Sequence, residues 1–121
     1  MRLLLLEIKE MEIEELINKF SDVEHCPIRN VVAHFSSKWA ILLLLALGEV
    51  STLRFSDLCR IMPDISAKVL SSTLKALERN GLIGRTVQPT VPPSVYYFLT
   101  EKGRSLLPIL NDLSRWARTQ M

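Results

Sequence analysis

Long apolar runs are missing from this sequence. The longest, Trp39 to Leu47, falls well short of the roughly 18 residues that a bilayer-spanning helix needs. The leucines from Leu3 to Leu6 end at Glu7, whereas the apolar region of a signal peptide needs about 7–15 residues. The two cysteines lack the spacing of a disulfide framework, which fits a reducing compartment. We therefore expect a cytoplasmic protein that does not bind membranes.

The patterns of common catalytic and metal sites are missing as well. The sequence has no glycine-rich phosphate loop, no nucleophile elbow and no paired carboxylates that suggest acid–base catalysis. His25 and Cys26 are neighbours and His34 is remote, so no C-x-x-C or H-x-x-x-H spacing for a metal exists. We expect no enzymatic activity, no metal and no cofactor.

The charge is unevenly distributed along the 121 residues, although the net charge is only +2. Residues 1–24 contain three Lys or Arg against seven Asp or Glu, and residues 25–121 contain twelve against six. An acidic segment does not favour a polyanion, whereas a basic one does. We therefore expect an acidic arm over residues 1–24 and a domain over residues 25–121 that can bind nucleic acid.

Both ends of the chain are predicted to form amphipathic helices. Apolar residues recur at helical spacing in the arm, at Ile13, Leu16, Ile17 and Phe20. A second apolar stripe follows Thr100, a plausible N-cap, and includes Leu106, Leu110, Leu113 and Trp116. These stripes exceed what one small domain can cover, so we expect them to form the interface of a two-fold symmetric homodimer.

The middle of the chain predicts helices followed by a hairpin. Pro27 opens a helix with apolar residues up to Phe35, and a nearly all-apolar helix runs from Lys38 to a cap at Gly48. A short helix ending at Pro63 precedes a longer one from an N-cap at Ser66 to Asn80-Gly81. Two β-rich runs, 82–87 and 95–99, flank a proline-rich tip. This order predicts a mainly α fold with a small β-hairpin wing, a winged helix-turn-helix.

The helix that starts after Ser66 has one apolar and one basic side. Val69, Leu70, Thr73, Leu74 and Leu77 are expected to pack on the core, and the opposite side presents Lys68, Ser71, Ser72, Lys75 and Arg79. Lys and Arg can neutralise phosphates or bind guanine, and short Ser side chains let the helix approach base edges. On an isolated helix such a surface is more often simply solvated. The preceding helix, the short turn and the hairpin favour DNA binding.

Several sequence blocks occur in order between residues 26 and 117. They are Cys26-Pro27-Ile28-Arg29, Ser37-Lys38-Trp39, Leu53-Arg54-Phe55-Ser56-Asp57-Leu58, Ile65-Ser66, Leu74 with Leu77-Glu78-Arg79-Asn80-Gly81-Leu82, Pro89-Thr90-Val91-Pro92-Pro93, and Tyr97-Phe98-Leu99-Thr100 with Gly103. Together they resemble the HxlR-type winged-helix regulators. The resemblance implies a transcriptional regulator that dimerises through its N- and C-terminal helices. Ser94 stands where the family often has Arg, which weakens a wing-to-phosphate contact.

The expected partner is double-stranded DNA with an inverted-repeat operator. The predicted DNA-binding residues are Lys38, Arg54, Ser56, Ser66, Lys68, Ser71, Ser72, Lys75, Arg79, Arg85, Gln88 and Thr90. The alternative is a winged helix that binds proteins without sequence-specific DNA binding; such a module would not need the basic face. The sequence leaves open the operator, the direction of regulation and any small-molecule effector.

Cys26 is the one candidate for a reactive group, as a redox sensor. It precedes a predicted helix whose free N–H groups favour a thiolate, and His25 is adjacent. Some regulators that this sequence resembles sense oxidants or electrophiles through a cysteine at this position. The alternative is a small packed side chain, which is the commoner role of such a cysteine.

Overall fold

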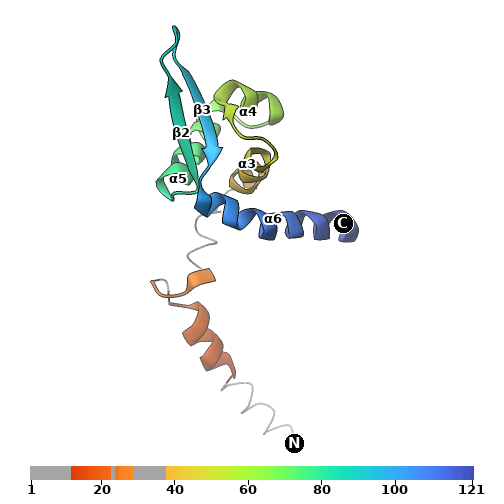
Figure 1. Cartoon of the computed structure of the whole chain (residues 1–121). Coiled ribbons are helices and arrows are strands. Elements are labelled where there is room, and N and C mark those ends of the chain that lie inside the picture. Colours follow the sequence, from red (N-terminus) through yellow and green to blue (C-terminus); the bar gives the residue numbers. More distant parts are fainter. Residues whose placement is uncertain (1–11, 23, 29–37) are drawn as a thin grey trace, which may run out of the picture. The chain divides into compact units, whose positions relative to one another are not determined.

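The computed structural model describes residues 12–22, 24–28 and 38–121 and divides the chain into two units, residues 1–36 and 37–121 (Figure 1). The domain boundary expected after residue 24 stays a prediction. Most of the helix predicted from Pro27 to Phe35 lies outside the described residues, as does the start of the acidic arm.

The first unit contains the predicted arm helix, which is helical over residues 12–20. A turn held by Asp22 follows: its Oδ1 accepts hydrogen bonds from the backbone N–H groups of Glu24 and His25, at 3.0 and 3.1 Å. The backbone N–H of Cys26 donates to the carbonyl of Asp22 at 3.1 Å, and residues 27–28 are again helical. The turn thus places Cys26 directly ahead of a helical segment, as expected.

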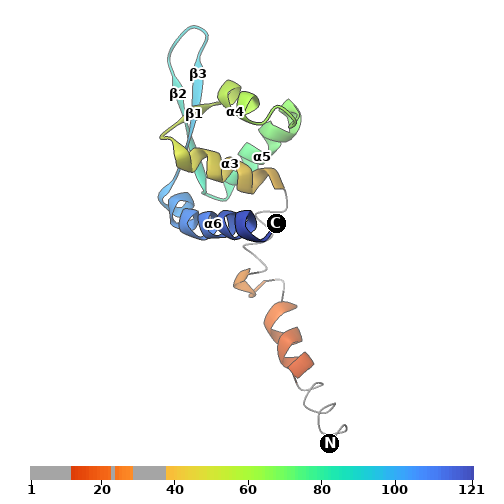
Figure 2. The ribbon, with the colours of Figure 1, turned by 90° about the vertical axis from the view of Figure 1, so that its right-hand side faces the viewer.

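The second unit is a winged helix-turn-helix, which confirms the predicted fold class (Figures 1 and 2). The three strands form an antiparallel sheet in the order β1-β3-β2. The elements follow one another as α3 (Lys38–Glu49), β1 (Leu53–Arg54), α4 (Phe55–Ile61), α5 (Ala67–Arg79), β2 (Ile83–Gln88), β3 (Ser94–Leu99) and α6 (Glu101–Gln120). The observed hairpin strands begin and end within one residue of the predicted β-rich runs.

The core of this unit forms where α3, α4 and α5 meet one face of the sheet. Its largest fully buried side chains are Leu43, Leu44, Leu47, Leu58, Leu70, Leu74, Leu77 and Ile83. Burying each such side chain stabilises the fold by about 1.5–3 kcal/mol relative to leaving it exposed. Helix α3 supplies three of them, so the all-apolar helix is central, as its sequence predicts. Figure 2 shows α6 running alongside α3.

Gly48 has a different role from the helix cap that the sequence suggests. Helix α3 continues through it to Glu49, and among the described glycines a positive φ occurs at Gly81 alone, at 75°. A Cβ on Gly48 would lie 2.7 Å from a methyl carbon of Leu107. Gly48 therefore lets α3 and α6 approach each other closely.

Candidate nucleic-acid interface

Helix α5 begins and ends at the predicted residues. The Ser66 hydroxyl accepts a hydrogen bond from the Val69 N–H at 3.1 Å, which satisfies one free donor of the first turn. At the other end, Gly81 adopts the left-handed conformation that glycine favours and stops the helix. The Ser66 oxygen, predicted to contact DNA, is thus already used as a helix cap.

One side of α5 forms a continuous polar stripe, which we call the recognition face: Lys68, Ser72, Lys75 and Arg79. These residues lie at i, i+4, i+7 and i+11, so they share one side of the helix, and all four are exposed. Ser71 lies at the edge and is half-buried. Val69 was expected in the core, but its side chain is 39% exposed on the other edge. The true buried stripe is Leu70, Thr73, Leu74 and Leu77.

The recognition face is positively charged, and no described acidic residue forms an ion pair with its cations. Lys68, Lys75 and Arg79 form no ion pair with any other residue that the structure describes. The sequence of α5 contains one acidic residue, Glu78, which lies towards the flank of the stripe. Unpaired, exposed cations on one helix face are available to an approaching polyanion.

The hairpin places three predicted residues at three different positions: Arg85, Gln88 and Thr90. Arg85 pairs with Tyr97 in the register, and Tyr97 is buried, so Arg85 belongs to the sheet face that packs against the helices. Gln88 pairs with Ser94 and therefore lies on the opposite face. Thr90 is in the tip, where its hydroxyl donates to the Pro92 carbonyl at 2.8 Å. Arg85 itself is exposed, whereas the Thr90 hydroxyl stabilises the loop.

Three predicted DNA-binding residues lie outside α5 and the hairpin. Lys38 starts α3, and its ammonium is 4.6 Å from the centre of the Trp39 ring. The Arg54 guanidinium lies 3.7 Å from a carboxylate oxygen of Asp57, which partly neutralises it. Ser56 is exposed in the first turn of α4. The structure places all three on the surface without joining them to the recognition face.

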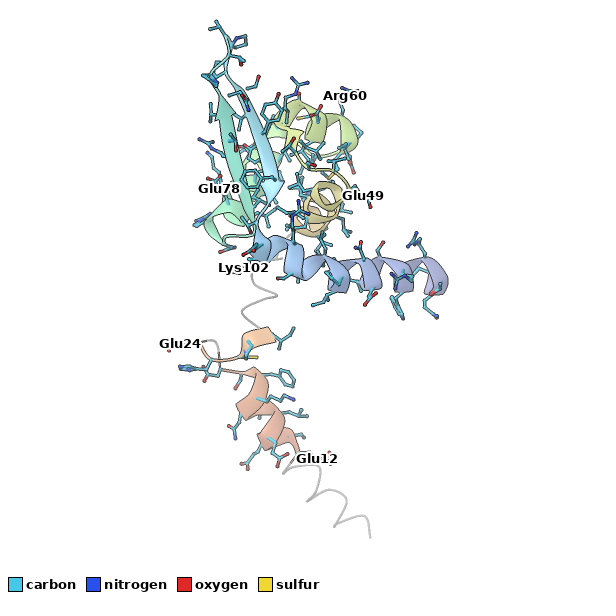
Figure 3. All side chains as sticks on the ribbon, viewed as in Figure 1. Glu12, Glu24, Glu49, Arg60, Glu78 and Lys102 are labelled. Atoms are coloured by element: carbon cyan, nitrogen blue, oxygen red, sulfur yellow. The ribbon has the colours of Figure 1, made fainter. Side chains whose placement is uncertain are left out.

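A joint between α5, β2 and α6 was not anticipated from the sequence. The Thr100 hydroxyl donates to the Gly81 carbonyl, and Lys102 Nζ donates to the Asn80 carbonyl at 2.9 Å. A Cβ on Gly103 would lie 2.1 Å from the Leu82 carbonyl oxygen. Figure 3 shows Lys102 at this junction, where α6 starts. The C-terminal end of α5 is therefore fixed against the first turn of α6.

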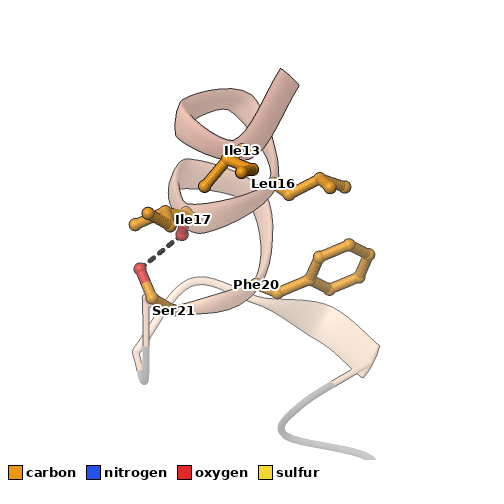
Figure 4. Close-up of a pocket in the computed structure, with 5 residues that line it drawn as sticks. All are labelled: Ile13, Leu16, Ile17, Phe20 and Ser21. Carbon is orange, nitrogen blue, oxygen red and sulfur yellow. Dashed lines mark hydrogen bonds between the residues drawn. The ribbon is translucent and has the colours of Figure 1, made fainter. Parts of the chain in front are cut away.

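The predicted dimer surface needs one correction. Leu110 is only 5% exposed in the single chain, so its side chain already belongs to the chain's own core. The apolar residues that α6 leaves exposed are Ile109, Leu113 and Trp116, with Leu106 half-buried. In the arm, the predicted stripe is exposed and lines an open hollow with Ser21 (Figure 4); its residues are Ile13, Leu16, Ile17 and Phe20.

The cysteines and histidines form no cluster within the described residues that could hold a metal ion. Cys26 is 3% exposed and Cys59 is half-buried, and both are free thiols. No helix among the described residues is both long and apolar enough to span a membrane.

Known proteins are similar to this chain in both sequence and fold. A family model described as "HxlR-like helix-turn-helix" matches residues 34–121. An uncharacterised HTH-type transcriptional regulator of Methanothermobacter thermautotrophicus is 44% identical over 93 residues, which cover 77% of this chain and 70% of that protein. A putative transcriptional regulator of the MarR family from Porphyromonas gingivalis W83 has a similar structure, with a TM-score of 0.76 and 35% identity over 81% of this chain and 95% of that one.

A further similar structure is that of a redox regulator. The redox regulator HypR in its oxidised form has a TM-score of 0.74 and 33% identity, covering 79% of this chain and 98% of that one. The residues that the family model matches, 34–121, include the helix-turn-helix, the hairpin and α6. The chain therefore belongs to the HxlR-like helix-turn-helix family.

Proposed function

We propose that this protein is a sequence-specific, double-stranded DNA-binding transcriptional regulator that acts as a homodimer on an inverted-repeat operator. The observation that carries the proposal is the recognition face: Lys68, Ser72, Lys75 and Arg79 lie exposed along one side of α5, with their cations unpaired among the described residues. A helix with this surface fits the major groove, where it can meet base edges and phosphates together. The names of its relatives support the same function.

The residues divide into two proposed roles. Lys68, Ser71, Ser72 and Lys75 face the groove, because they lie in the first nine residues of α5, towards the N-terminal end that a helix-turn-helix inserts. Arg79 and Arg85 lie nearer the end of α5 and the start of the hairpin, and contact flanking phosphates. Ser66 contributes mainly by capping the helix, so its DNA contact is secondary.

Two exposed apolar stripes support the homodimer. The arm stripe of Ile13, Leu16, Ile17 and Phe20 and the α6 stripe of Ile109, Leu113 and Trp116 are each about half exposed in the single chain. Exposed apolar stripes of this kind are typical of interfaces in symmetric oligomers. A dimer would present two recognition helices to major grooves about 34–36 Å apart.

Alanine substitution on the recognition face tests the proposal. Duplexes selected by the protein from a random-sequence library serve as the operator probe, and affinity is measured over a series of salt concentrations. Lys68→Ala and Lys75→Ala should each weaken binding, and a variant that loses a phosphate contact should show a salt slope flatter by about one unit.

The controls remove charge elsewhere. Arg118→Ala removes one exposed cation from the last turn of α6, and Glu12→Ala removes one charge from the arm helix. Both should bind the selected duplex like the wild type. Wild-type affinity in both lysine variants, or a library selection that enriches no sequence, would contradict the DNA-binding assignment and favour a protein-binding role.

A further inference from the structure

Val69 lies in the first turn of α5, and the rest of the unit covers it only in part. Its side chain is 39% exposed, whereas the side chain of Leu70 beside it is fully buried. It adjoins Lys68 and Ser72 at the edge of the recognition face. The exposed part of an apolar side chain adds nothing to the stability of the single chain, so it can still bury area against a partner.

Hydrogen bonds to both backbone groups of Val69 hold the residue in place. Its N–H donates to the Ser66 hydroxyl at 3.1 Å, and its carbonyl accepts from the hydroxyls of Ser72 and Thr73 at 3.0 and 2.7 Å. A valine in a helix has one strongly preferred rotamer, and each Cα–Cβ bond is tilted towards the helix N-terminus. The Val69 methyl groups therefore lean towards the end of α5 that a helix-turn-helix inserts, and a contact there costs little side-chain entropy.

Ser72 lies one turn further along α5, and its hydroxyl can only accept a hydrogen bond from a base in this conformation. Its hydrogen is donated to the Val69 carbonyl, which leaves the lone pairs of its oxygen for a partner. On the major-groove edges of the bases, the hydrogen-bond donors are the amino groups of adenine and cytosine. Ser72 therefore fits an adenine or a cytosine.

The spacing of Val69 and Ser72 favours one of these two bases. Residues i and i+3 of a helix have Cβ atoms about 5–6 Å apart, so these two side chains reach neighbouring groups on one base-pair edge. An A·T pair presents the adenine amino group and the thymine methyl group on the same major-groove edge, on either side of the thymine O4. A G·C pair offers an amino group but no methyl group. An A·T pair therefore matches both side chains.

We propose that Val69 and Ser72 together read an A·T pair in each operator half-site. The Val69 methyl groups contact the thymine methyl, and the Ser72 oxygen accepts a hydrogen bond from the adenine amino group. The inference rests on the proposed function, because it needs α5 in the major groove. It adds a sequence preference that Lys68 and Lys75 do not supply, since their ammonium groups donate to guanine or phosphate. Neither contact involves a charge on the protein, so this preference does not depend on salt.

Removing the thymine methyl tests the Val69 contact without changing the protein. Each thymine in one half-site of the library-selected duplex is replaced in turn by uracil, which lacks the methyl group and pairs in the same way. At one position the wild type should bind about fourfold more weakly, as expected for one buried apolar carbon, with an unchanged salt slope. Val69→Ala should bind the thymine and uracil duplexes equally at that position.

The Ser72 contact is tested on the adenine of the same base pair. Replacing this adenine by unsubstituted purine removes the amino group, and the wild type should then bind about fivefold more weakly, as expected for one hydrogen bond. Ser72→Ala should bind the adenine and purine duplexes equally. The comparison between the two proteins cancels any effect of the replacement on the duplex itself.

Val50→Ala is the matched control. Val50 is also an exposed valine, at 46%, and it follows the end of α3, outside α5. This variant should retain the full difference between the thymine and uracil duplexes. Thermal unfolding should show that Val69→Ala and Ser72→Ala are both folded at the temperature of the binding measurement.

The results separate this inference from the function on which it rests. If the wild type selects no sequence from the library, the proposed function fails. If it selects half-sites without an A·T pair, or binds every uracil duplex like the thymine duplex, the A·T preference is overturned while DNA binding stands. A uracil effect that persists unchanged in Val69→Ala overturns the assignment to Val69.

Discussion

A hydrogen bond within α5 limits which hydrogen bonds Ser72 could form with DNA. The hydroxyls of Ser72 and Thr73 both donate to the Val69 carbonyl, at 3.0 and 2.7 Å. Ser72 therefore retains lone pairs on the recognition face while its hydrogen is engaged. In this conformation it can accept a hydrogen bond from the amino group of adenine or cytosine, and it cannot donate to a phosphate. Lys68 and Lys75 supply the donors on either side of it.

At the same scale, burial of Cys26 bears on the redox hypothesis. The side chain is 3% exposed, so in this conformation an oxidant or electrophile has little access to the sulfur. Redox sensing by Cys26 stays a proposal, which the structural similarity to the redox regulator HypR supports.

Sensing by Cys26 requires the turn that buries its side chain to open. A small alkylating maleimide should then reduce DNA binding by the wild-type protein, and Cys26→Ser should bind DNA normally and resist this effect. The measurement is duplex affinity before and after treatment, with mass spectrometry to locate the adduct. Cys59→Ser is the control and should remain sensitive, because Cys59 lies on α4 in the other unit. If the adduct at Cys26 forms without any loss of affinity, the cysteine has a packing role.

At the scale of elements, the joint around Gly103 connects α5, the helix proposed to enter the major groove, to α6, the helix with the exposed apolar stripe. Thr100 caps α6 through its contact with the Gly103 N–H at 3.2 Å and also holds the Gly81 carbonyl. Two neighbouring carbonyls at the end of α5, those of Asn80 and Gly81, are thus bound by residues of the α6 N-terminus. A shift of α6 must therefore move the end of α5 or break these bonds.

Gly103→Ala should lower the free energy of unfolding by about 1–3 kcal/mol, because the new Cβ would meet the Leu82 carbonyl oxygen, 2.1 Å away, and the two backbones must separate. A loss of stability would be informative, because replacing glycine by alanine inside a helix normally stabilises a protein by about 1 kcal/mol. Thermal or urea unfolding measures the effect. Asn111→Ala, at an exposed position of the same helix, should be near neutral or stabilising. A stabilised Gly103→Ala variant would show that the joint is loose in solution.

At the scale of the whole molecule, the two exposed apolar stripes raise the question of the oligomeric state. Ile109, Leu113 and Trp116 lie on one side of α6 and remain more than half exposed. A single 13.8 kDa chain with this stripe and a second one on its arm leaves an unusual amount of apolar surface in water. A symmetric pair of chains would bury it and set the distance between two recognition helices.

Light scattering of the full chain at micromolar concentration should give about twice 13.8 kDa. Leu113→Glu should shift the protein towards the monomer and weaken binding to an inverted repeat more than to a half-site, because it puts a charge into the proposed interface. Asn111→Glu adds the same charge at a position outside the stripe and should remain dimeric. A monomeric wild type would exclude the proposed interface.

The sequence alone determined those features that depend on local chemistry and periodicity. Ser66 and Gly81 mark the ends of α5 because a cap and a positive φ are local requirements, and the stripe of Lys68, Lys75 and Arg79 follows from helical spacing. The order of helices and strands, and with it the winged helix-turn-helix fold, could be predicted for the same reason.

The tertiary structure decided what depends on residues far apart in the chain. Val69 and Leu110 have apolar side chains in suitable helical positions, but their burial depends on which neighbouring element covers them. Gly48 and Gly103 are explained by the approach of α6 to α3 and to the end of α5, which no local pattern records. Gln88 and Arg85 are close in sequence, yet the pleat and register of the sheet place them on opposite faces.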